Sequence, residues 1–223
     1  KATGVSRSSL ALYAMIRNLK GKDVLDLGCG EGYMSLGALM LGARKVACVD
    51  SENVSKALMR NAKINGFPIS KIRFIQSDLL NELPKGIKFD AIIANLPQHA
   101  LPATPEAKKL SGKNGGYDGT DLVCRAISEA AHYLKPGGRY YGSVSELTNA
   151  KRTMSIIKSL YSIEAVRTEK KTIHPGEMLP FITDRALAKH LTSLKKNGLL
   201  FRPGNSIKIP VTYKVHRYEL RIK

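Results

Sequence analysis

A carboxylate and a cluster of glycines follow the first strongly apolar run of the chain. The run DVLDLGCGEG spans residues 23–32 and places Asp26 two positions before Gly28. Glycines in such a turn let the backbone approach a ligand closely and leave the N-terminus of the following helix open. The carboxylate would repel a dinucleotide pyrophosphate, whereas it would pair with an amino group. The turn therefore predicts a site for an adenosyl amino acid and not for a dinucleotide.

Two further acids end neighbouring apolar runs. Asp50 follows the run KVACV, and Asp78 follows the run RFIQS. Because a carboxylate at the end of a second strand suits hydrogen bonds to ribose hydroxyls, we expect Asp50 to hold a ribose. Asp78 has two open interpretations, since it could accept a hydrogen bond from an adenine amino group or cap a helix.

These residues depend on a regular alternation of elements for their positions. Between residues 21 and 173, short β-rich runs alternate with helical stretches, which predicts a parallel sheet with helices on both faces. An opening helix is expected at 9–20, and residues 97–118 are expected to form a long loop. The predicted strands are 23–27, 45–49, 73–76, 89–94, 139–144, 162–173 and 211–222. Sheets of this kind bind ligands at the carboxyl ends of their strands, where the acids lie.

The order of the motifs resembles a known family. DVLDLGCGEGYMSLGAL, ACVD, QSDLL, NLPQ and LKPGGRYY are similar to the successive motifs of class I S-adenosylmethionine-dependent methyltransferases, over roughly residues 10–173. The resemblance implies a Rossmann-like fold and S-adenosylmethionine as cofactor, with its methionine part at the glycine turn, its ribose on Asp50 and its adenine near Asp78. The residues predicted to bind this cofactor are Asp26, Gly28, Cys29, Gly30, Asp50, Ser51, Asp78, Leu79 and Asn95. Cys29 is interpreted as a small apolar filler and not as a nucleophile.

The segment NLPQ decides the type of reaction. Amino methyltransferases carry Asn or Asp here, then Pro, Leu or Ile, then Pro, then an aromatic residue. A planar NH₂ group is a poor nucleophile because its lone pair is delocalised. The oxygen of Asn95 and the carbonyl of Leu96 could accept its two hydrogens and stabilise the developing positive charge, while Pro97 fixes the turn. The alternative is a buried turn with no role in catalysis.

Gln98 departs from the family pattern, because the family has an aromatic residue that stacks on a planar target. Either His99, Tyr117 or Phe181 supplies the stacking, or the target is not a flat base. The segment GGYDGTDLVCRAI at 115–127 resembles the one that follows Asn-Pro-Pro-Tyr in release-factor glutamine methyltransferases, and we expect it to order the loop. The N-terminal helical domain of that family has no counterpart in residues 1–22, so glutamine is a second choice.

The positive charge is concentrated towards the C-terminus. The 223 residues carry 36 Lys and Arg against 18 Asp and Glu, a net +18, of which residues 151–223 supply +11. Such an excess favours a polyanionic partner, although a solvated basic surface is the alternative. A helix is predicted at 184–196, with Thr183 as N-cap and three leucines on one face. Its other face carries the predicted substrate contacts Arg185, Lys189 and Lys196, which join Gln98, His99 and Tyr117.

The composition narrows the class of protein further. No apolar stretch is long enough to span a membrane, and three cysteines are too few for a disulfide framework, so a cytoplasmic location is expected. The five histidines lack partners at metal-ligand spacing, so we predict no metal. The predicted organisation is one domain: an N-terminal helix at 1–22, a cofactor-binding core at 23–173, a basic insertion at 174–206 and a last strand at 207–223.

The sequence therefore predicts an N-methyltransferase that acts on a macromolecule. RNA, ribosomal or transfer, is the first choice because of the charge. A protein glutamine or amine, a small molecule, or a catalytically inactive module that binds cofactor and RNA are the successive alternatives. The oligomeric state is left open.

Overall fold

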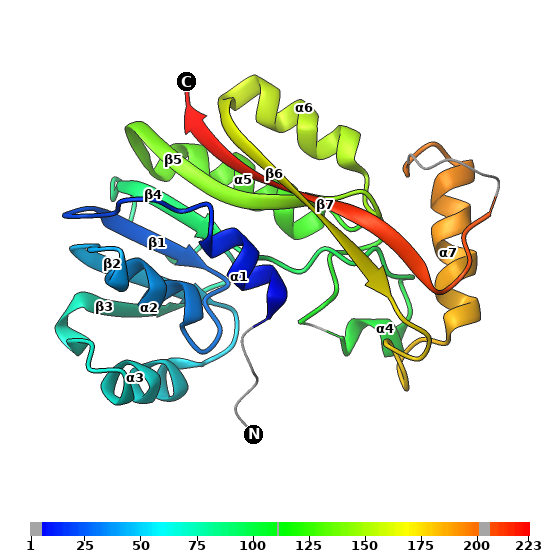
Figure 1. Ribbon diagram of the computed structural model, residues 1–223, viewed down its shortest axis with the longest axis horizontal. Helices are drawn as coiled ribbons and strands as arrows, with labels where there is room; N and C mark the ends of the chain where they lie inside the picture. Colours follow the sequence, from blue (N-terminus) through cyan, green and yellow to red (C-terminus); the bar gives the residue numbers. More distant parts are fainter. Residues whose placement is uncertain (1–5, 111, 201–205) are drawn as a thin grey trace.

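A seven-stranded sheet runs through the computed structural model, which describes residues 6–110, 112–200 and 206–223 (Figure 1). The strands are β1 (Asp23–Leu27), β2 (Lys45–Asp50), β3 (Ile72–Gln76), β4 (Phe89–Ala94), β5 (Leu134–Ser145), β6 (Tyr161–Ile173) and β7 (Val211–Ile222). Their order is β3-β2-β1-β4-β5-β7-β6, and β7 alone runs antiparallel to its neighbours. The predicted, mostly parallel sheet is confirmed. Residues 1–5 and 201–205, which belong to the predicted N-terminal segment and insertion, lie outside the described residues.

Helices cover both faces of the sheet, as the alternation predicts. The helices α1 (Arg7–Tyr13), α2 (Tyr33–Met40) and α3 (Ser55–Ile64) pack on one face, and α5 (Asp121–Ala130) and α6 (Ala150–Leu160) pack on the other (Figure 1). Successive side chains of a strand point to opposite faces. Val24 therefore joins the core under α1–α3, whereas Leu25 and Leu27 join the core under α5 and α6. Burial on both faces explains why the central strands are continuous apolar runs.

The first helix is shorter than the sequence indicates. It begins at Arg7, where the Ser6 hydroxyl accepts a hydrogen bond from the Ser9 amide, and it ends at Tyr13 instead of Lys20. Leu12, Ile16 and Leu19 are all buried at helical spacing, but Ile16 and Leu19 lie outside the helix. The Leu19 amide donates instead to the carbonyl of Leu41 at 3.1 Å. Tertiary contacts therefore override the helical period after the second turn.

Two helices begin at places that the apolar pattern does not give. Ser51 follows β2 and is a residue type that caps helices, but α3 begins only at Ser55 and has no side-chain cap. The region 97–118, predicted as a loop, contains the short helix α4 (Pro105–Lys108), which begins where Thr104 accepts from the Ala107 amide.

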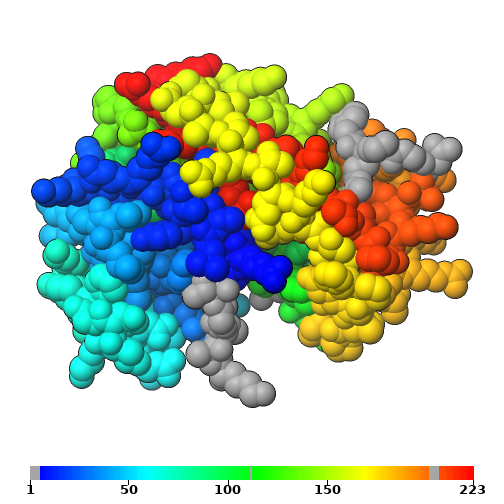
Figure 2. Space-filling view, in the orientation of Figure 1, coloured from blue at the N-terminus to red at the C-terminus, as the bar shows by residue number. Residues whose placement is uncertain are grey.

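Helix α7 (Asp184–Lys196) forms with the predicted bounds. The Thr183 hydroxyl accepts from the Ala186 amide at 3.3 Å, and the three leucines are buried. These leucines share a third apolar cluster with residues of the 97–118 segment, β6 and β7. In the space-filling view, the yellow surface of β6 and the following segment lies between α1, in blue, and α7, in orange (Figure 2).

The strand order places the predicted site at a reversal in the sheet. From β1 the chain proceeds outward to β2 and β3, and then returns to β4 on the opposite side of β1. Leu27 pairs with Ala94 across β1 and β4, so the glycine turn that follows β1 meets Asn95, which follows β4. Open sheets bind ligands at this kind of crevice.

Candidate active site

A cavity of about 540 Å³ opens at the carboxyl ends of β1, β2 and β4. Seven of the nine residues predicted to bind the cofactor line it, namely Gly28, Gly30, Asp50, Ser51, Asp78, Leu79 and Asn95. Leu79 has φ +50°, a left-handed conformation that is uncommon for a bulky side chain. Backbone strain of this kind clusters at ligand sites, since the surrounding structure must enforce it.

The glycine turn is held by the acid that ends β2. One carboxylate oxygen of Asp50 accepts from the Gly30 amide at 2.8 Å, and the other accepts from the Glu52 amide at 3.1 Å. Gly28 has φ +74°, and a Cβ atom there would lie 2.8 Å from the side chain of Leu96. A side chain at position 28 would therefore push the turn away from the residue that follows Asn95.

Asp26 and Cys29 do not line the cavity, because both side chains are buried in the protein interior. The Ser35 hydroxyl donates to Asp26 at 2.5 Å, yet burial dominates and raises the pKa of this carboxyl to about 7. A hydrogen bond with Cys48 and burial together raise the pKa of the Cys29 thiol above its usual value. Cys29 is thus a neutral thiol in the core, which agrees with its interpretation as a filler.

Asp78 lies at the cavity with an ionic partner. The guanidinium of Arg125 donates to its two carboxylate oxygens at 3.3 and 3.0 Å. This pairing raises the pKa of Arg125 above its usual value. Asp78 accepts these bonds without capping a helix, and each of its oxygens keeps a lone pair for a further donor.

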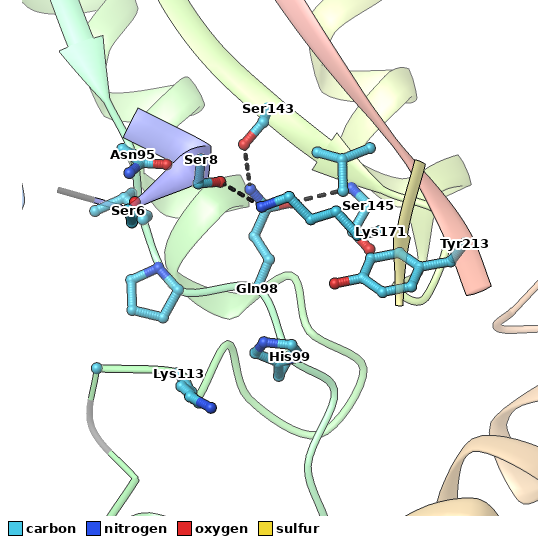
Figure 3. A pocket seen from close by; sticks show the side chains of 14 residues that line it. Ser6, Ser8, Asn95, Gln98, His99, Lys113, Ser143, Ser145, Lys171 and Tyr213 are labelled. Atoms are coloured by element: carbon cyan, nitrogen blue, oxygen red, sulfur yellow. Dashed lines mark hydrogen bonds between the residues drawn. The ribbon is translucent and has the colours of Figure 1, made fainter. Parts of the chain in front are cut away.

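A second cavity of about 260 Å³ lies on the other side of the NLPQ segment (Figure 3). Asn95, Leu96, Pro97 and Gly112 line both cavities. The amide nitrogen of Asn95 donates to the Ser9 hydroxyl at 2.9 Å. This bond orients the amide group of Asn95. Its side-chain oxygen is a free acceptor, since none of the described residues donates a hydrogen bond to that oxygen. Asn95 therefore stands at the junction of the two cavities with one hydrogen-bond acceptor available.

The two cavities carry opposite charges. The larger one is lined by the carboxylates of Glu31, Asp50, Glu52 and Asp78, and its described lining residues include no basic side chain, although Asp78 is paired with Arg125. The smaller one is lined by Lys113 and Lys171, with no acid among its described lining residues. The NLPQ segment thus separates a site suited to a cationic ligand from one suited to an anionic ligand.

Gln98 lines the smaller cavity but is fixed to β5. Its amide nitrogen donates to the Ser143 hydroxyl at 2.7 Å, and its oxygen accepts from the Ser145 amide at 3.0 Å (Figure 3). Its backbone also touches the GGYDG segment, because a Cβ atom on Gly115 would lie 2.7 Å from the Cα of Gln98. The side chain of Gln98 therefore positions the turn instead of offering a stacking surface.

The other predicted substrate contacts fall into two places. His99 lines the smaller cavity, and its burial lowers its pKa to about 4, so its ring is neutral at physiological pH. Tyr117 does not line this cavity, and its ring meets His190 edge-on at 4.8 Å. The three predicted basic contacts on α7 are exposed and line neither cavity: Arg185, Lys189 and Lys196. Phe181 packs in the apolar cluster around α7.

Sequence reasoning missed several polar residues of the smaller cavity. Ser6 and Ser8 come from the start of α1, and Ser143, Lys171 and Tyr213 come from β5, β6 and β7. Strand alternation places Lys171 on the same face of β6 as Glu169 and could have singled it out. No local sequence signal predicts that the serines line this cavity, because their position depends on how α1 packs against the sheet.

Two absences concern the described residues only. In ranges 6–110, 112–200 and 206–223, no cluster of three or more His, Cys, Asp or Glu side chains could hold a metal ion. Over the same residues, no helix is long and apolar enough to cross a membrane.

Comparison with known proteins supplies names for this arrangement. Residues 6–119 match the family model of ribosomal protein L11 methyltransferase (PrmA). A candidate protein N5-glutamine methyltransferase of Methanocaldococcus jannaschii is 36% identical over 160 residues, which cover 70% of this chain and 78% of that protein. A ribosomal protein L11 methyltransferase of a Synechococcus species is 31% identical over 127 residues, 55% of this chain but only 42% of that protein.

A solved structure shares the fold. The 16S rRNA N2 G1207 methyltransferase of T. thermophilus, in complex with AdoMet and guanosine, superimposes with a TM-score of 0.56 at 22% identity. The match covers 75% of this chain and 41% of that one.

Proposed function

This chain belongs to the ribosomal protein L11 methyltransferase (PrmA) family of S-adenosylmethionine-dependent methyltransferases, and from that premise we propose that it methylates an exocyclic amino nitrogen of a nucleobase in RNA. The choice of RNA as the substrate rests on the two cavities that meet at Asn95, one lined by acidic and the other by basic residues. A cationic methyl donor suits the acidic cavity, and a polyanionic substrate suits the basic one.

The residues of the larger cavity fit the cofactor. Its glycine turn has open space where a Cβ of Gly30 would stand, and the Asp50 carboxylate at the end of β2 suits the ribose hydroxyls. Asp78, which is paired with Arg125, would face the adenine, and the carboxylates of Glu31, Asp50 and Glu52 suit the positive charge of a sulfonium. When bound, S-adenosylmethionine supplies an electrophilic methyl group.

Asn95 and Leu96 act on the accepting nitrogen. The Asn95 oxygen and the Leu96 carbonyl each accept one hydrogen of a planar amino group, which directs its lone pair towards the methyl group and stabilises the positive charge that develops on nitrogen. Ser9 supports this role, because its bond to the Asn95 amide nitrogen keeps the oxygen turned to the substrate. His99 is neutral, so the positive charge of this cavity comes from Lys171 and from Lys113, of which Lys113 is paired with Glu177.

A glutamine side-chain amide in a protein is the second candidate. Gln98 stands where an aromatic residue would stack on a base, and its side chain is held by Ser143 and Ser145. The M. jannaschii relative is named for a protein glutamine reaction. The same two acceptors would orient an amide NH₂, so the chemistry at Asn95 is shared and the two candidates differ in the substrate.

Transfer of a labelled methyl group from the cofactor to a cell extract tests the proposal. We expect label in RNA, removed by nuclease and retained after protease. Label in protein would replace RNA by the glutamine or amine alternative, and label in neither fraction would favour a small molecule or an inactive module. Asn95→Ala provides the catalytic control. We infer a cytoplasmic site of action, which the three unpaired, buried cysteines favour.

A further inference from the structure

Lys171 carries a half-buried ammonium group at the wall of the smaller cavity. It extends from β6 towards α1, where it donates to the Ser8 hydroxyl at 2.8 Å (Figure 3). An ammonium group has three donors, so this bond leaves two of them free. No carboxylate of the described residues lies within ion-pair distance of its nitrogen, and burial lowers its pKa.

The acids around Lys171 are already engaged with other cations. Glu169, two residues earlier on β6, pairs with the buried guanidinium of Arg217 at 2.5 Å. Glu177 pairs with Lys113 at 3.3 Å. Glu169 and Glu177 therefore act on Lys171 only at longer range, and its half-buried ammonium group has donors free for an anion that arrives with the substrate.

We propose that Lys171 binds the phosphate of the nucleotide whose base lies against Asn95. This inference rests on the proposed function for the identity of the substrate. Asn95 and Lys171 line one cavity of about 260 Å³, so a single ligand can contact both residues. One nucleotide supplies both chemical groups at once: an amino group for the acceptors of the NLPQ segment and an anion for the ammonium.

The lining of the cavity favours a nucleotide over a peptide. A glutamine amide is neutral and offers nothing that requires an ammonium, whereas a phosphate oxygen forms a charge-assisted hydrogen bond with it. The phenol of Tyr213 also faces the cavity, and burial raises its pKa to about 12, so it remains a neutral donor beside the lysine (Figure 3). Together Lys171 and Tyr213 present N–H and O–H donors to an anion.

The competing explanation is that Lys171 only anchors α1 through Ser8. Three matched variants separate the two explanations. Ser8→Ala removes the anchoring bond and keeps the charge. Lys171→Arg keeps the charge with a different shape. Lys170→Ala removes the same charge from the adjacent, exposed position, which alternation places on the opposite face of β6.

The experiment measures binding of a labelled, random-sequence single-stranded RNA octamer at several salt concentrations. Lys171→Ala should weaken binding about tenfold or more, since hydrogen bonds to charged groups are strong. It should also make the slope of log affinity against log salt shallower by about 0.7, the value for one phosphate of a single strand. Ser8→Ala, Lys171→Arg and Lys170→Ala should keep the wild-type slope.

Three results would overturn the inference: an unchanged slope in Lys171→Ala, an equal loss in Ser8→Ala or Lys170→Ala, or no RNA binding by the wild type. The labelling assay of the proposed function is read separately. Label in protein together with the Lys171 slope change would refute RNA methylation and the placement of a target base at Asn95, while it would still show a phosphate contact at Lys171. Label in RNA with an unchanged slope would refute the phosphate site alone.

Discussion

Substituting Asp26 by asparagine should change how the stability of this protein depends on pH. Asp26 is 1% exposed, and its only described side-chain donor is the Ser35 hydroxyl. Burial raises the pKa of its carboxyl in the folded protein to about 7 from the ordinary value of 3.8, and the nearby charge of Asp50 acts in the same direction. The unfolded chain exposes this carboxyl to water, where the ordinary pKa applies.

The sign of the effect follows from proton binding. Between about pH 3.8 and 7, folded Asp26 keeps its proton while unfolded Asp26 has lost it. Stability from this group is therefore fully present below pH 3.8 and is lost as the pH rises to about 7, by up to about 1.4 kcal/mol per pH unit. The total is about 4 kcal/mol, a large part of the roughly 5–15 kcal/mol that stabilises a typical protein.

Asp26→Asn removes this titration and keeps an oxygen that can accept from Ser35. Urea unfolding at about pH 4.5, 5.5, 6.5 and 7.5 would give the free energy of unfolding of both proteins, and other titrating groups cancel in the difference. From pH 4.5 to 7.5, the free energy of unfolding of the variant should rise by about 3 kcal/mol relative to that of the wild type. We expect the difference to level off near pH 7.

A difference that stays constant across these pH values would refute the reasoning. It would mean that folded Asp26 is already ionised at pH 4.5, so that the Ser35 hydrogen bond outweighs burial. A difference that grows through this range and does not level off near pH 7 would place the folded pKa higher than about 7, which would preserve the direction of the argument while correcting its magnitude.

Three further predictions concern the cavities and α7. Asp50→Ala should weaken cofactor binding by about 1.5–3 kcal/mol, the range for hydrogen bonds to a charged group, and unchanged affinity in calorimetry would remove Asp50 from the ribose site. Asn95→Ala should lower kcat by about 10²–10³ with cofactor affinity retained, and near-normal turnover would reduce the NLPQ segment to a structural turn. The salt slope of RNA binding should become shallower by about 2–3 when alanine replaces three exposed side chains of α7, and an unchanged slope would identify a solvated surface. These side chains are Arg185, Lys189 and Lys196.

Elements with strong local signals could be predicted from the amino-acid sequence. Strands β1, β2 and β4 are apolar runs too short for a helix, and Thr183 and Asn197 mark the two ends of α7. The glycine turn and the acid after β2 could be placed together, because parallel strands bring their carboxyl ends to one edge. The part of the candidate site that lies at the carboxyl ends of the parallel strands could therefore be predicted.

The smaller cavity could not be predicted from the sequence, because its lining residues come from segments that lie far apart along the chain. Ser9 and Asn95 are 86 residues apart along the chain, and Asn95 and Lys171 are 76 apart. Their proximity depends on two features of the tertiary structure that no short segment encodes. Helix α1 ends at Tyr13 because Leu19 bonds to the turn after α2. Strand β7 inserts between β5 and β6, which sets the position of Lys171. Contacts of this kind form only when the helices and strands pack together. The burial of apolar surface that drives this packing is not directional, so no local segment of the sequence specifies them.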